Sequence, residues 1–107
     1  MLPTGPEYFY AYLGILRAGA GAVPIYPPAR LYQIEEHVRR HAGILANAQT
    51  PLLLSVAVAR GVARLLEARV AGLHRVATAP ELLEGVGRPI AAPIASGDIA
   101  FLQYTGR

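Results

Sequence analysis

The clearest pattern in the sequence lies in residues 30–56, which read RLYQIEEHVRRHAGILANAQTPLLLSV. Its first part, Arg30 to Asn47, predicts an amphipathic helix because its apolar residues recur three, four and seven positions apart. These residues are Leu31, Ile34, Val38 and Leu45. Thr50 and Pro51 break the helical pattern, and Leu52 to Val56 forms the continuous apolar run that is typical of buried parallel strands. A helix followed by a buried strand indicates an α/β fold.

The polar residues of this helix support the same orientation. If the apolar side faces the sheet, the charged side chains face water, and each Glu precedes an Arg by four residues, the favourable order for an ion pair on a helix. The predicted pairs are Glu35 with Arg39 and Glu36 with Arg40.

Outward from this stretch, helical and strand patterns alternate. Residues 6–18 predict a helix that is apolar on nearly all sides and therefore buried, ending at Gly19 and Gly21. Residues 57–70 predict another helix and residues 80–83 a helical turn. Strands are expected at 22–26, 52–56 and 74–78, with a final strand at 99–104. Such alternation predicts two parallel, right-handed βαβ units, which form a partial parallel sheet with flanking helices.

Composition points to an incomplete unit. The chain has 107 residues, enough for one domain, and is 53% hydrophobic but only 16% charged. A chain of this size leaves much of its surface exposed, so some of that surface should be apolar. We therefore expect residues 1–107 to be one incomplete subdomain fragment that self-associates through an exposed apolar face.

Composition and charge also exclude several classes. Cysteine is absent, so disulfides and thiolate metal sites are excluded. All ten basic residues are Arg, which removes the Lys of a phosphate-binding P-loop and any Schiff-base chemistry. The net charge is +3, but the Arg residues are scattered among Glu, so no nucleic-acid partner is expected. Neither a signal peptide nor a membrane span is recognisable, and a cytoplasmic location is the expectation.

Local clusters of reactive residues predict no catalytic or metal site. Gly19-Ala20-Gly21 follows a helix and opens a strand, the reverse of a dinucleotide-binding fingerprint. His37 and His41 lie one helical turn apart, but no third ligand accompanies them, and we expect both to be solvated. Ser55, Ser96 and His74 suggest no nucleophile arrangement.

Two blocks near the ends of the chain carry a resemblance to a known family. The first runs from Leu2 to Pro28 and contains LPTGPEYF, GILRAGA and PIYPP; the second, residues 98–105, reads DIAFLQYT. Together they resemble the acyl-adenylate-forming superfamily of AMP-dependent synthetases and ligases, most closely the fatty-acyl-AMP ligases and related acyl-CoA synthetases. The resemblance covers essentially the whole chain, including the helix around Ile34 to Arg40.

This resemblance implies a fold, a reaction and partners. The chain would be a slice of the N-terminal domain of an adenylate-forming enzyme. Such enzymes use ATP and Mg²⁺ to convert a fatty acid into acyl-AMP, and then transfer the acyl group to the thiol of CoA or of an acyl-carrier protein. Thr105 maps onto the first residue of the ATP phosphate loop, whereas Gly106 and Arg107 depart from the Ser/Gly/Thr-rich continuation of the family. The isolated chain is therefore expected to be inactive, and no catalytic residue is assigned.

Two other interpretations remain open. The chain could be a non-catalytic α/β interaction or regulatory module derived from such an enzyme. A small Arg-rich nucleic-acid binder is the weakest interpretation, and salt-dependent binding to nucleic acid would support it.

Overall fold

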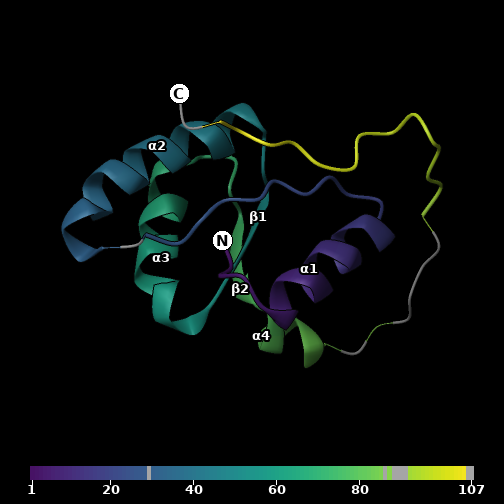
Figure 1. Ribbon diagram of the computed structural model, residues 1–107, viewed down its shortest axis with the longest axis horizontal. Coiled ribbons are helices and arrows are strands. Elements are labelled where there is room, and N and C mark those ends of the chain that lie inside the picture. Colours follow the sequence, from purple (N-terminus) through teal and green to yellow (C-terminus); the bar gives the residue numbers. More distant parts are fainter. Residues whose placement is uncertain (29, 86, 88–91, 106–107) are drawn as a thin grey trace.

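The computed structural model describes residues 1–28, 30–85, 87 and 92–105, with the backbone alone for Leu31. The chain forms an α/β structure with a parallel two-stranded sheet, as the sequence predicts (Figure 1). The longer helices are α1 (Pro6–Arg17), α2 (Ile34–Asn47) and α3 (Arg60–Arg69), the strands are β1 (Leu52–Ser55) and β2 (Arg75–Thr78), and the short helical segments are η1 (Leu31–Gln33), η2 (Ala57–Ala59) and α4 (Ala79–Leu83). Within these described residues, no helix is both long and apolar enough to cross a membrane.

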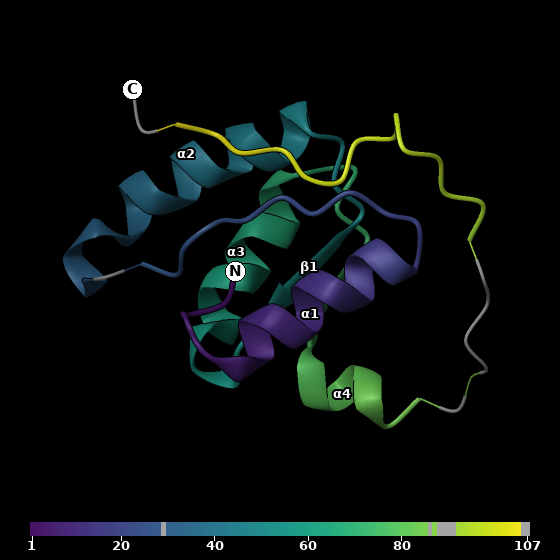
Figure 2. The same cartoon turned by 45° about the vertical axis from the view of Figure 1, so that its right-hand side comes forward.

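The centre of the fold is one βαβ unit. Strands β1 and β2 pair in parallel, with Leu53 opposite Val76 and Ser55 opposite Thr78, and α3 connects them. Helices α2 and α3 lie on one side of the strands and α1 on the other (Figures 1 and 2). The core contains residues from both strand and helix, among them Val38, Leu45, Leu53, Ala63, Leu66 and Leu73.

The buried side of helix α2 is the predicted one, although the main neighbour of this helix is α3 and not the sheet. Val38 and Leu45 are buried and Ile34 packs against the core, while Glu35, Glu36, Arg39 and Arg40 are exposed. The helix begins at Ile34 rather than Arg30, because Leu31–Gln33 form a 3-10 turn instead. The side chain of Leu31 lies outside the described residues. The ion pair also differs from the prediction, since Arg39 contacts Glu36 at 2.5 Å, three residues away instead of four.

The predicted strands at 22–26 and 99–104 are wrong as strands. They form a single parallel bridge, between Ala22 and Phe101. Pro24 has no N–H to donate to a ladder, and Pro27-Pro28 follow directly, so pairing cannot extend along this segment. Of the two expected βαβ units, the one between residues 52 and 78 is present, in parallel as predicted.

Helix α1 forms where predicted, but the prediction that it is buried is wrong. None of its residues is buried. One side, with Tyr8, Ala11, Tyr12 and Ile15, lines a cavity, whereas Phe9, Tyr10 and Leu13 point to solvent. The apolar pattern that surrounds this helix therefore has a partner on one side only.

The segment 57–70 is helical, but it begins with the 3-10 turn η2 before α3. Val62 and Leu66 are buried as their spacing predicts, whereas Val58 is 93% exposed and Leu65 is also exposed. Helix α4 covers the predicted turn at 80–83, and its N-cap Thr78 accepts a hydrogen bond from the Glu81 N–H at 3.4 Å.

Gly19 ends α1 in a conformation that other residues rarely adopt. Its φ is +79°, and a Cβ placed there would lie 2.7 Å from the Cβ of Ala92. We expect Gly19→Ala to lower the free energy of unfolding by about 1–2 kcal/mol, because a left-handed residue costs about that much for an L-amino acid. Chemical denaturation measures this change.

Gly14→Ala is the matched control. Gly14 lies inside α1, and an added Cβ would meet nothing within 4 Å, so its replacement is expected to raise the free energy of unfolding by about 0.5–1 kcal/mol. Equal effects of the two substitutions would contradict the assigned geometry of Gly19.

Candidate functional site

The structure brings the two blocks that carry the family resemblance together. The N–H of Ala22 donates to the carbonyl of Ala100 at 2.9 Å, and the N–H of Leu102 donates to the carbonyl of Ala22 at 2.8 Å. The ring of Tyr12 in α1 meets the ring of Phe101 edge-on, with centroids 6.3 Å apart. Segments from opposite ends of the sequence thus form one layer beside α1 and above β1 (Figure 2).

Thr105 lies beside the solvent-facing side of α2. Its carbonyl accepts a hydrogen bond from the guanidinium of Arg40 at 3.2 Å, and its side chain is exposed. Next to it, the hydroxyl of Tyr104 donates to Oδ1 of Asn47 at 2.5 Å, and Tyr104 also packs against the core. Two anchors on α2 therefore hold the segment that leads into Thr105. Gly106 and Arg107 lie outside the described residues.

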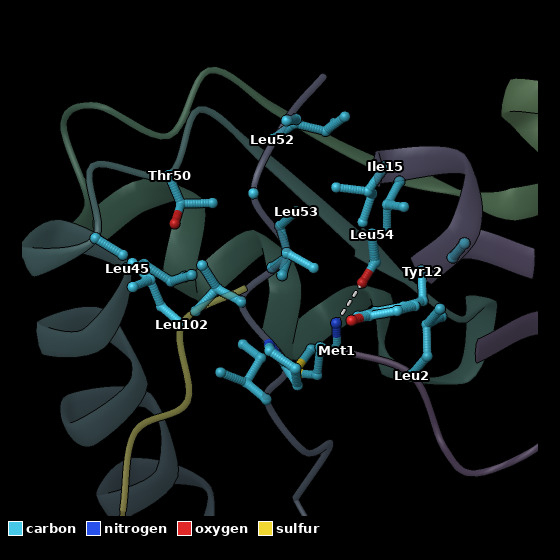
Figure 3. A pocket seen from close by; sticks show the side chains of 18 of the residues that line it. Met1, Leu2, Tyr12, Ile15, Leu45, Thr50, Leu52, Leu53, Leu54 and Leu102 are labelled. Atoms are coloured by element: carbon cyan, nitrogen blue, oxygen red, sulfur yellow. Dashed lines mark hydrogen bonds between the residues drawn. The ribbon is translucent and has the colours of Figure 1, made fainter. Parts of the chain in front are cut away.

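A cavity of about 570 Å³ lies between α1, residues 20–25, β1 and residues 99–102 (Figure 3). This volume is within the range of small-molecule sites, about 300–1,000 Å³. Its walls are mostly apolar; the lining residues include Leu2, Tyr12, Ile15, Leu52, Leu54 and Leu102. Thr50 also lines it, and the hydroxyl of Thr50 is buried without a hydrogen-bond partner in the described part of the chain.

The amino group of Met1 lies on the edge of β1 that faces the cavity. It donates to the carbonyl of Leu54 at 2.6 Å (Figure 3). Desolvation by burial lowers the pKa of this amine from 8.0 to about 5. This hydrogen bond holds Met1 against β1.

The prediction that His37 and His41 are both solvated is wrong. His41 is only 8% exposed, and the two rings stack with centroids 3.9 Å apart. Nδ1 of His41 bonds to the carbonyl of His37 at 2.8 Å, and Nε2 of His37 bonds to the carbonyl of Tyr26 at 2.6 Å. Burial is the main cause that lowers the pKa of His41. The pair therefore ties the segment after Ile25 to α2, a structural role.

The other reactive residues lie apart from one another. Ser55 is buried in β1, where its hydroxyl donates to the carbonyl of Val56. The carboxylate of Asp98 accepts the N–H of Ala95 at 2.9 Å and closes a local turn. Across residues 1–28, 30–85, 87 and 92–105, no three His, Asp or Glu side chains gather into a metal-binding group.

Sequence reasoning named Thr105 as a candidate, and it predicted neither the cavity nor the contacts that hold residues 104 and 105. The contact between Tyr104 and Asn47 spans 57 positions, and the contact between Arg40 and Thr105 spans 65. No local sequence pattern encodes such separations. No protein-family model, curated protein or solved structure matches the chain.

Proposed function

We propose that the chain is an early part of the N-terminal domain of an AMP-forming acid–thiol ligase, of the fatty-acyl-AMP ligase and acyl-CoA synthetase kind. The observation that carries this proposal is the contact between the two blocks of the resemblance. Ala22 follows the first helix of one block and Phe101 lies in the strand-like segment of the other, and they pair in parallel. The pairing brings the two blocks side by side, as expected if they belong to one site, and this supports the proposal.

The activity of the whole enzyme would be acyl adenylation. The fatty-acid carboxylate attacks the α-phosphorus of ATP, the bond to the departing pyrophosphate breaks, and acyl-AMP forms. The acyl group then passes to the thiol of CoA or an acyl-carrier protein, and AMP leaves. We place this enzyme in the cytoplasm.

Within this chain, Thr105 is the residue assigned to the ATP site, as the start of the phosphate loop. The bond from Tyr104 to Asn47 and the bond from Arg40 to the carbonyl of Thr105 would hold the residues at which that loop begins. The described residues do not fit a Mg²⁺ site, because Asp98 accepts the N–H of Ala95 and no three metal-ligating side chains gather among these residues. Metal binding would fall to residues outside this stretch.

The first test is pyrophosphate release from Mg-ATP with a panel of fatty acids. We expect no turnover by the 107-residue chain, because it has no Lys and its phosphate loop is reduced to Thr105 and two non-matching residues. Loss of a single donor to a developing charge already lowers rates about 10²–10³-fold. Turnover above a no-protein control that survives repeated purification would overturn the fragment assignment.

The second test uses the full product of the reading frame that contains these residues. In a product that continues into a Ser/Gly/Thr-rich loop, Thr105→Ala should lower turnover by about 10²-fold, whereas Ser96→Ala, which removes another exposed hydroxyl, should leave it unchanged. Failure of that product on every acid would contradict the ligase. A stop codon directly after Arg107 would favour the non-catalytic interaction module instead.

A further inference from the structure

The outer side of α1 is apolar and uncovered. Tyr10 is 73% exposed, Leu13 61% and Phe9 57%, and these three side chains lie on the side of the helix that points away from the cavity. We call them the α1 face. Ile99 and Phe101 add exposed apolar surface on the neighbouring segment, which the Tyr12–Phe101 ring contact joins to α1.

The molecule exposes more surface than a monomeric protein of its mass. Its accessible surface is 7813 Å². A folded monomer of this mass exposes about 5,800 Å², so the excess is about 2,000 Å². Helix α1, which has no buried residue, and residues 93–103, all of which are exposed, contribute to this surface. A stable interface needs about 800 Å² from each partner, so the excess is ample for one.

The distribution of charge indicates which partner fits. Inside α1 the only charged residues are Glu7 and Arg17, near its two ends, and Asp98 is the one charged residue between 92 and 105. When two copies meet about a two-fold axis, each residue of the interface approaches its own counterpart, so like charges repel. A face without central charge avoids this penalty, and it offers no complement to a charged partner.

We propose that the α1 face is the interface of a homodimer of this chain. This inference goes beyond the proposed ligase and does not depend on it. The apolar contact makes the dimer insensitive to salt, because no ion pairs form at its centre, while salt screens the repulsion between two molecules of net charge +3.

The test measures the oligomeric state of the 107-residue chain by sedimentation equilibrium. Protein concentrations from 5 to 500 μM cover about two decades, the range in which a dimer with a micromolar Kd dissociates. We expect a monomer–dimer equilibrium that is unchanged or strengthened between about 50 and 500 mM NaCl. The double variant Tyr10→Arg, Leu13→Arg should weaken dimerisation at least about 100-fold, since it places like charges opposite each other in a desolvated contact.

Val58→Arg is the matched control, because Val58 is at least as exposed but lies on η2, outside the α1 face. It should dimerise like the unmodified chain, and circular dichroism should show that both variants remain folded. A monomer at every concentration overturns the proposal. A dimer that persists in the double variant also overturns the proposal, because the contact would then lie elsewhere. A dimer that dissociates in salt overturns it as well, because the contact would then be ionic. Assembly into large, polydisperse species likewise overturns it.

Discussion

Val38→Asp is expected to remove most of the free energy that stabilises the folded protein at 25 °C. Val38 is 2% exposed and belongs to the hydrophobic core. An aspartate there buries a carboxylate without a partner, which costs about 3–5 kcal/mol. Domains are stable by about 5–15 kcal/mol, and small ones lie near the lower end. Circular dichroism and thermal melts measure the loss, which should exceed that of any single substitution on the surface of α2.

Two controls separate burial from charge. Gly43→Asp adds the same carboxylate to the exposed side of the same helix, where nothing lies within 4 Å of a new Cβ, and it should melt near the unmodified protein. Glu36→Ala removes an exposed charge and should also change the melting temperature little. If Val38→Asp melted together with these two, the assignment of the buried side of α2 would be wrong.

Acid is expected to destabilise the 107-residue chain with a free Met1 amino group well before its carboxylates are protonated. The pKa of that amine is about 5 in the folded protein and 8.0 when it is unburied. Between these values the unfolded chain binds a proton that the folded chain does not, so the free energy of unfolding falls as the pH is lowered. Three pH units correspond to about 4 kcal/mol. Above pH 8 and below pH 5 the amine does not make the free energy of unfolding depend on pH.

Urea denaturation at one-unit steps from pH 8 to pH 5 measures this effect as a falling midpoint. Because burial lowers the pKa of His41 as well, His41 adds a loss of the same sign, but only near and below its unburied pKa of 6.5. The change from pH 8 to pH 7 therefore reports on the amine. Acetylation of the amino group should abolish that change. A midpoint that is flat from pH 8 to pH 6 would show that the amine is not desolvated.

The part of the fold that the sequence predicts best is the part where pattern and packing agree. The spacing of Ile34, Val38 and Leu45 identified the buried side of α2, and the apolar run at Leu52 identified β1. Both elements meet their partners within the neighbouring 30 or so residues, the usual length of a βαβ unit. Local sequence therefore carries most of the information about residues 34–78.

Prediction failed where the outcome depends on distant partners. Apolar residues all around α1 indicate burial only if other elements cover every side of the helix. In the structure, other elements cover only one side of it. Residues 22–26 have strand-like composition, but a strand needs a neighbour with free N–H and C=O groups along its length. His41 is buried and its ring stacks on His37, which bonds to the carbonyl of Tyr26 outside the helix, and spacing within α2 does not reveal that bond. For the same reason, no local pattern paired residue 22 with residue 101.

The contacts that complete the candidate site are also those that close the longest loops. Met1 reaches Leu54 across 53 residues, Tyr104 reaches Asn47 across 57, and Arg40 reaches Thr105 across 65. Closing each loop costs chain entropy, and this cost grows with the logarithm of loop length. Few side chains in α1 or residues 99–105 are buried, so burial there offsets little of the cost. The unit from α2 to β2 can thus assemble first, with both ends of the chain docking onto it last. In the folded protein the same ends detach at the lowest free energy, so the cavity and the approach to Thr105 can open while the central unit stays intact.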